Sequence, residues 1–209
     1  ALVKNPKTII DIGANIGLYT QHLHKKFPSA EYFLFEPSKV NADILTKKFN
    51  FNNKIQVFNK AASNYNGKSE LFSVTSGNPL NSLIKQDFFH DEVTKFNFSE
   101  ETEVVRLDSQ NFFKKLEKID YIKIDTEGNE YNVLEGLGKD IKKCKLIQFE
   151  FGMGTLYAKK YFLDFWNFFK KKDFSLYIIT PAGPKLISEY SYKFEHFDVI
   201  NFIALNNNL

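Results

Sequence analysis

The chain has 209 residues, of which 43% are hydrophobic and 25% are charged. This length and composition are typical of one soluble globular domain, so we expect residues 1–209 to form a single domain without a membrane span. The net charge of +3 is too small to attract polyanions strongly, and we expect no nucleic-acid partner. The single cysteine excludes an internal disulfide and favours the cytoplasm. The sequence starts at Ala1 without a methionine, which is consistent with further residues upstream.

The first third of the chain alternates short apolar runs with helical patterns. A tight turn at Gly13 to Gly17 separates the first strand from a helix. A second helix is expected over residues 40–49, with Ser38 as its cap. Strands are expected over residues 8–12, 32–35 and 55–58.

The rest of the chain continues this alternation with buried strands at 121–125 and 145–150. Strands that alternate with helices pair in parallel, so we predict an α/β, doubly wound sheet with helices on both faces. Residues 175–180 and 197–205 predict an antiparallel pair at the sheet edge. Residues 73–101 show no clear period, which is typical of an insertion that covers a substrate.

In such a sheet a ligand binds beyond the carboxyl ends of the strands, so the residues that follow each strand are informative. After the first strand, glycines at 13 and 17 allow a sharp turn and a close approach to a ligand. After the second strand, Glu36 lies 23 positions beyond Gly13, where a carboxylate can accept hydrogen bonds from both ribose hydroxyls. Together these features indicate a nucleoside ligand.

The glycine spacing distinguishes two nucleoside ligands. A dinucleotide requires a G-x-G-x-x-G turn for its pyrophosphate, and Asn15 stands where the middle glycine would be. Asp11 is poorly placed for a pyrophosphate but suits the cationic amino group of a methionine moiety. The sequence therefore favours S-adenosylmethionine over a nicotinamide cofactor.

Four segments together resemble the FkbM-type methyltransferases: residues 11–17 (DIGANIG), 35–37 (FEP), 59–63 (NKAAS) with Gly67, and 123–136 (KIDTEGNEYNVLEG). The resemblance implies a class I methyltransferase (Rossmann-like) fold with a mostly parallel seven-stranded sheet, strand order 3-2-1-4-5-7-6 and the last strand antiparallel. It also implies O-methylation of a sugar or another small hydroxylated metabolite. By position, the first turn would line the methionine part, Glu36 the ribose, and residues 59–62 the adenine edge. The predicted cofactor-binding residues are Asp11, Gly13, Ala14, Asn15, Gly17, Glu36, Pro37, Asn59, Lys60 and Ala61.

Methyl transfer to a hydroxyl requires removal of a proton, so the site needs a base or a metal ion. The resemblance places Asp125 at the methyl group, where it can act as base or as a ligand of a divalent metal such as magnesium, with Glu127 and Glu150 as further oxygen donors. An acid at a helix N-terminus explains Glu130 without a catalytic role. His196 and His90 are further candidate bases. The predicted catalytic residues are Asp125, Glu127 and His196.

Two alternatives stay open from the sequence. A nicotinamide-dependent oxidoreductase could use the same sheet, although the middle glycine is missing. A non-catalytic module could bind S-adenosylmethionine without a competent base, although the carboxylates around Asp125 weigh against it. The sequence does not indicate the acceptor or the oligomeric state.

Overall fold

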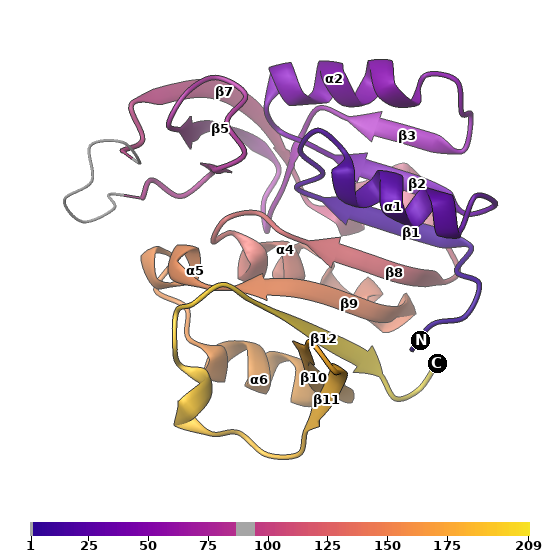
Figure 1. Ribbon diagram of the computed structural model, residues 1–209, viewed down its shortest axis with the longest axis vertical. Coiled ribbons are helices and arrows are strands. Elements are labelled where there is room, and N and C mark those ends of the chain that lie inside the picture. Colours follow the sequence, from indigo (N-terminus) through magenta and orange to yellow (C-terminus); the bar gives the residue numbers. More distant parts are fainter. Residues whose placement is uncertain (1, 87–94) are drawn as a thin grey trace.

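The computed structural model describes residues 2–86 and 95–209, and its centre is an eight-stranded sheet with the order β3-β2-β1-β8-β9-β12-β10-β11 (Figure 1). β1 pairs in parallel with β2 and β8, whereas β12 runs antiparallel to both β9 and β10. The expected order 3-2-1-4-5-7-6 is confirmed, with β8, β9, β10 and β12 as the fourth to seventh strands, and β11 is an additional eighth strand. The strands of this sheet are β1 (Thr8–Ile12), β2 (Glu31–Phe35), β3 (Ile55–Phe58), β8 (Ile119–Ile124), β9 (Cys144–Phe151), β10 (Phe174–Thr180), β11 (Gly183–Ile187) and β12 (Ile200–Asn206).

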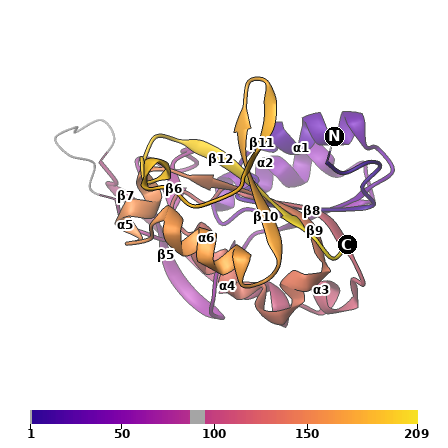
Figure 2. The ribbon, with the colours of Figure 1, turned by 90° about the horizontal axis from the view of Figure 1, so that it is seen from below.

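Helices cover both faces of the sheet, as Figure 2 shows, with α1 and α2 on one side and α3, α4 and α6 on the other. Separate apolar clusters fill the two layers, one around Tyr32 and Leu45 and the other around Phe149 and Phe165. The rings of Phe149 and Phe165 stack with centroids 5.1 Å apart. The doubly wound arrangement is therefore confirmed. The helices are α1 (Leu18–Lys26), α2 (Lys39–Phe49), α3 (Asn111–Lys115), α4 (Glu130–Gly136), α5 (Met153–Tyr157) and α6 (Phe162–Lys170), and short 3₁₀ helices span Leu107–Ser109, Gly138–Lys143 and Tyr192–Phe194.

The antiparallel pair expected near the C-terminus is confirmed, but its position at the sheet edge is wrong. β12 lies inside the sheet between β9 and β10, and β11 forms the edge. The stretch that contains Pro181 and Gly183 makes a tight hairpin turn, after which β11 pairs with β10 from Gly183 to Ile187. The middle residues of β11 are exposed, so the strand has no buried run that the sequence pattern could reveal.

A second, smaller sheet lies beside the carboxyl ends of the central strands (left in Figure 1). Its strands, in the order β4-β7-β5-β6, are β4 (Ala61–Ala62), β5 (Gly67–Ser73), β6 (Asn81–Ser82) and β7 (Phe98–Val105). The segment 73–101 is thus not wholly irregular, since it includes β6 and the start of β7. The ion pairs Lys68–Glu101 (2.6 Å) and Lys60–Glu103 (2.8 Å) explain why polar residues stand in these strands. Residues 87–94, with the candidate base His90, lie outside the described residues.

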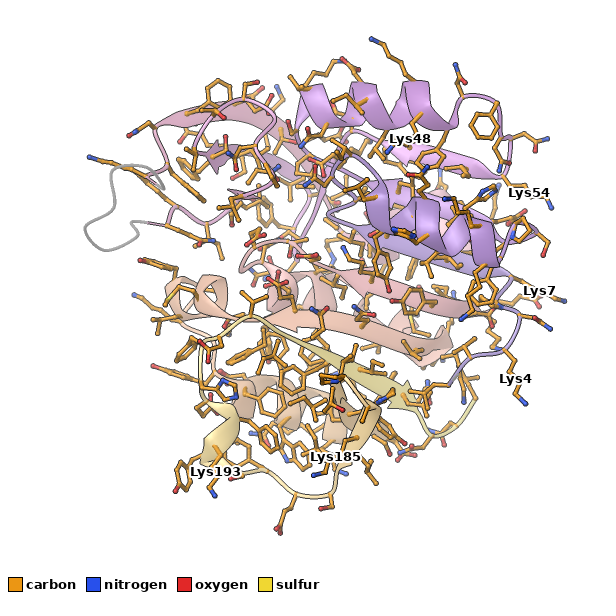
Figure 3. All side chains as sticks on the ribbon, viewed as in Figure 1. Lys4, Lys7, Lys48, Lys54, Lys185 and Lys193 are labelled. Carbon is orange, nitrogen blue, oxygen red and sulfur yellow. The ribbon has the colours of Figure 1, made fainter. Side chains whose placement is uncertain are left out.

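Within residues 2–86 and 95–209, no helix is long and apolar enough to cross a membrane. Figure 3 labels six lysines at separate places around the outline of the molecule, among them Lys48 in α2, Lys7 before β1 and Lys185 in β11.

Candidate active site

A cavity of about 350 Å³ opens where β1, β2 and β8 end, between the central sheet and the small sheet. The position agrees with the rule that ligands of open α/β sheets bind beyond the carboxyl ends of the strands. Nine residues predicted from the sequence line it: Gly13, Ala14, Asn15, Glu36, Pro37, Lys60, Ala61, Asp125 and Glu127. It is also lined by residues that were not predicted, among them Tyr19, Lys123 and Thr126 and, from the segment 73–101, Pro79, Asn81, Ser82 and Leu83.

The glycines of the turn after β1 serve packing within the protein. Gly13 has φ +76°, and a Cβ there would lie 1.7 Å from the carbonyl oxygen of Asp125. Gly17 also has φ +76°, and its Cβ would lie 2.6 Å from the side chain of Leu45 on α2. Gly17 does not line the cavity, so its predicted contact with the cofactor is replaced by close packing against α2. Asn15 between them has φ +49°, a left-handed conformation that asparagine tolerates better than most residues.

The Glu36 carboxylate is 1% exposed and is held by two backbone groups. The N–H of Asn15 donates to Oε2 at 2.8 Å, and the N–H of Ser38 donates to Oε1 at 2.9 Å. Each oxygen keeps a further lone pair, so the carboxylate can still accept two hydrogen bonds from the cavity. Burial raises the pKa of Glu36 to about 7. Ser38 stands at the N-cap position of α2 as predicted, but its side chain makes no capping hydrogen bond there.

Asp11 and Asn59 lie next to the cavity without lining it. The hydroxyl of Thr20 donates to Asp11 Oδ2 at 2.5 Å, and Asp11 Oδ1 lies 3.5 Å from Lys123 Nζ. The structure therefore does not place Asp11 where it could touch a methionine amino group directly, because the carboxylate points into the protein. Asn59 Nδ2 donates to the backbone oxygens of Glu36 (3.0 Å) and Pro37 (2.9 Å), so Asn59 supports the part of the cavity wall that contains Glu36.

Lys123 is a buried lysine that the sequence reasoning missed as a site residue. Its Nζ lies 3.0 Å from Asp125 Oδ2, 3.5 Å from Asp11 Oδ1 and 5.1 Å from the centroid of the Tyr19 ring. Burial favours the neutral amine, but the two carboxylates outweigh it and raise the pKa of Lys123. The available signal was a lysine between isoleucines in the apolar run of β8.

Three carboxylates meet at the end of the cavity opposite Glu36. Oxygen atoms of Asp125, Glu127 and Glu150 all lie within 4.8 Å of one another, as the sequence predicts for the first two and suggests for the third. Burial, and then the charge of Asp125, raise the pKa of Glu127 and of Glu150 to about 8. These hard oxygen donors have the chemistry that Mg²⁺ prefers. At neutral pH, however, a cation would have to displace protons from Glu127 and Glu150.

Glu130 and His196 are not members of this cluster, although the charge of Glu130 also raises the pKa of Glu127 and Glu150. Glu130 is fully buried, and its carboxylate accepts hydrogen bonds from the backbone N–H groups of Thr126 (2.7 Å) and Gly128 (2.9 Å), so it braces the turn before α4. His196 is partly exposed, and its Nδ1 lies 3.7 Å from Asp198 Oδ2. It is not among the residues that line the cavity, so the structure does not bring this predicted catalytic histidine to Asp125.

The strand order 3-2-1-4-5-7-6, with a cavity at the ends of the first, second and fourth strands, is that of a class I methyltransferase fold. A sequence profile of the methyltransferase FkbM domain matches residues 11–176. The chain belongs to the FkbM methyltransferase family.

Named relatives agree with this assignment. The methyltransferase sdnD of Sordaria araneosa is 26% identical over 164 residues, which are 66% of this chain and 63% of sdnD. The 2-O-methyltransferase NoeI of Sinorhizobium fredii is 28% identical over 165 residues, which are 75% of this chain and 68% of NoeI. The crystal structure of a methyltransferase FkbM from Methylobacillus flagellatus has a TM-score of 0.58 at 15% identity, over 95% of this chain and 44% of that chain. The chain thus spans less than two thirds of sdnD and less than half of the solved structure.

Proposed function

We propose that this chain is the catalytic domain of an S-adenosylmethionine-dependent O-methyltransferase that acts on a hydroxyl group of a small molecule, with sugars as the first class to test. One observation carries the proposal: the same cavity is lined by the buried Glu36 carboxylate, whose oxygens each keep a lone pair, and by Asp125 and Glu127, which cluster with Glu150. The first suits a ribose, and the second suits the removal of a proton from a hydroxyl. The name of NoeI as a 2-O-methyltransferase supports the choice of oxygen as the acceptor atom.

The cofactor would lie along the cavity from Lys60 to Asp125. In this placement Glu36 accepts hydrogen bonds from the ribose hydroxyls, and Lys60 and Ala61 border the adenine. Asp11 acts indirectly, because it fixes Lys123 beneath the reacting end. Gly17 and Asn59 do not line the cavity, but they contact residues that form or support its walls.

Bound S-adenosylmethionine would supply an electrophilic methyl group on sulfur. The acceptor oxygen forms the new bond to carbon as the carbon–sulfur bond breaks, and its proton passes to a base. Glu127 is the best matched base, because its pKa of about 8 is close to neutral pH and, unlike Glu150 with the same raised pKa, Glu127 lines the cavity. Asp125 is held by the Lys123 ammonium at 3.0 Å, so we assign it the orientation of the acceptor hydroxyl, with proton removal as its alternative role.

A magnesium ion could be held by Asp125, Glu127 and Glu150 and would then polarise the acceptor oxygen. Lys123 already supplies a positive charge beside Asp125, where the metal ion would supply one. We therefore favour the role of the acids as bases over their role as metal ligands. Activity in the presence of a chelator distinguishes the two roles, since a metal-dependent reaction stops and a simple base continues.

The segment 73–101 would cover the acceptor. Pro79, Asn81, Ser82 and Leu83 come from this segment and line the cavity. Pro79 and Leu83 offer apolar surface and Asn81 a polar amide, whereas the Ser82 hydroxyl is already bonded to Glu127 and Ile84. This mixture suits a neutral hydroxylated compound.

Calorimetry with S-adenosylhomocysteine and NAD, followed by methyl-transfer assays on a panel of neutral sugars, tests the proposal. We expect binding of S-adenosylhomocysteine, weaker binding of NAD, and methylation of at least one sugar hydroxyl. Tighter binding of NAD would favour the oxidoreductase alternative. Binding of S-adenosylhomocysteine without transfer to any hydroxylated compound would favour the non-catalytic module.

A further inference from the structure

Two side chains of the small sheet and its connection converge on one backbone oxygen of the site. Ser82 Oγ donates to the carbonyl oxygen of Glu127 at 2.7 Å, and Gln86 Nε2 donates to the same oxygen at 2.5 Å. Ser82 and Gln86 are each 1% exposed. The Ser82 hydroxyl also accepts a hydrogen bond from the N–H of Ile84 at 3.0 Å, which leaves its own proton directed to Glu127.

The Glu127 backbone needs this support, because it has an unfavourable conformation. Its φ is +53°, in the left-handed region that residues with a Cβ seldom adopt, and Gly128 follows with φ +106°. On one side the Glu130 carboxylate accepts from the Gly128 N–H at 2.9 Å. On another side the backbone of Gly154 packs so closely that a Cβ on Gly128 would lie 2.5 Å from its carbonyl oxygen. Ser82 and Gln86 complete this enclosure of the turn.

We propose that Ser82 and Gln86 are positioning residues, which hold the Glu127 peptide in its left-handed conformation and so keep the Glu127 carboxylate beside Asp125 and Glu150. The inference rests on the proposed function for its catalytic meaning. Ser82 also lines the cavity, whereas Gln86 contacts Glu127 without lining it.

The test measures the ionisation of Glu127 directly. The protein is labelled with glutamate carrying carbon-13 at the carboxyl group, the Glu127 signal is assigned with Glu127→Gln, and its pH titration is followed by NMR. In the unchanged protein we expect a midpoint above the ordinary glutamate value, because burial and the charge of Asp125 raise the pKa of Glu127, and the neighbouring Glu150 titrates together with it. In Ser82→Ala combined with Gln86→Met, the midpoint should fall by at least about one pH unit towards the ordinary value, because the freed carboxylate gains water and moves away from Asp125.

Ser73→Ala is the matched control. Ser73 is also buried in the small sheet, and its hydroxyl donates to the carbonyl oxygen of Thr75 at 2.8 Å, so this change removes a similar hydrogen bond that does not reach Glu127. The midpoint of Glu127 should stay unchanged in this variant. If the double variant does not fold, Ser82→Ala alone tests the inference. We then expect the midpoint of Glu127 to shift in the same direction by a smaller amount.

An unchanged midpoint in folded Ser82→Ala and in the double variant, or an equal shift in Ser73→Ala, overturns the inference. The binding of S-adenosylhomocysteine to the unchanged protein is measured separately. A protein that does not bind it refutes the proposed function while the titration still reports on positioning. A protein that binds it but shows no shift of Glu127 in the variants keeps the proposed function and refutes the positioning role.

Discussion

Cofactor affinity should depend on pH through Glu36. Burial raises the pKa of this carboxyl to about 7, above its ordinary value of 4.5. Ribose hydroxyls donate hydrogen bonds to it, and these stabilise the carboxylate more than the carboxylic acid. Binding should therefore require the ionised form, and a protonated Glu36 should release its proton when the ligand binds.

The size of the effect follows from the fraction of Glu36 that is ionised. At pH 6, one unit below this pKa, about one tenth of the molecules carry the anion, whereas at pH 8 about nine tenths do. The dissociation constant should then be roughly tenfold larger at pH 6 than at pH 8, which corresponds to a loss of about 1.4 kcal/mol in binding free energy. Affinity is thus nearly full at about pH 8 and above, and it is lost as the pH falls through the pKa of about 7.

Calorimetry with 5′-methylthioadenosine measures this effect, because that ligand keeps the ribose and lacks the amino-acid part. Repeating the titration in two buffers of different ionisation enthalpy counts the protons released. Glu36→Gln is the control, since it keeps the shape but cannot ionise. We expect weaker binding by this variant at pH 8 and a flat pH dependence. A flat dependence in the unchanged protein, or the same slope in Glu36→Gln, would refute the reasoning.

Three further predictions concern the reacting end and the turn after β1. Asp125→Asn should lower turnover on an identified acceptor by roughly two to four decades while calorimetry shows little change in cofactor affinity, and near-normal turnover would remove Asp125 from the reaction. Because the pKa of Glu127 is raised above its ordinary value, the folded protein binds the extra proton between about pH 4.5 and 8 and loses stability as the pH rises. In urea denaturation Glu127→Gln should therefore raise the free energy of unfolding by about 1 to 3 kcal/mol at pH 9 and leave it unchanged at pH 4. Gly13→Ala should lower that free energy by more than about 2 kcal/mol, since its Cβ would strike the Asp125 carbonyl, and Gly183→Ala, with open space around it, should lose less.

The middle of the central sheet could be predicted because its inner strands are buried on both faces. All five residues of β1 and four of the five in β2 are buried, so each strand forms a continuous apolar run that ends at a turn. β5 and β7 lack this signal. Their residues pair across the small sheet, with Lys68 opposite Glu103, and such cross-strand partners are distant in sequence.

The candidate site was predictable where a residue follows a strand directly. Gly13, Glu36 and Asp125 satisfy this condition, and all three line the cavity. The direction of a side chain was not predictable, and Asp11 shows why: its position in β1 turns its carboxylate towards Thr20 and Lys123. Ser82 was missed because its contact with Glu127 joins residues 45 positions apart, and no local pattern reports such a contact.

The residues that break the ordinary rules of folding gather around one cavity. Asn15 and Glu127 have left-handed backbones, and Glu36 and Glu127 are acids whose pKa values burial raises to about 7 and 8. Each of these features lowers the free energy of unfolding. The loss would be smaller if amides replaced the buried acids, or if glycine replaced the left-handed residues. Such local conflicts are expected where a protein binds and reacts, because the groups must be poised for a ligand rather than satisfied within the fold. These strained and buried groups therefore favour this cavity as the active site.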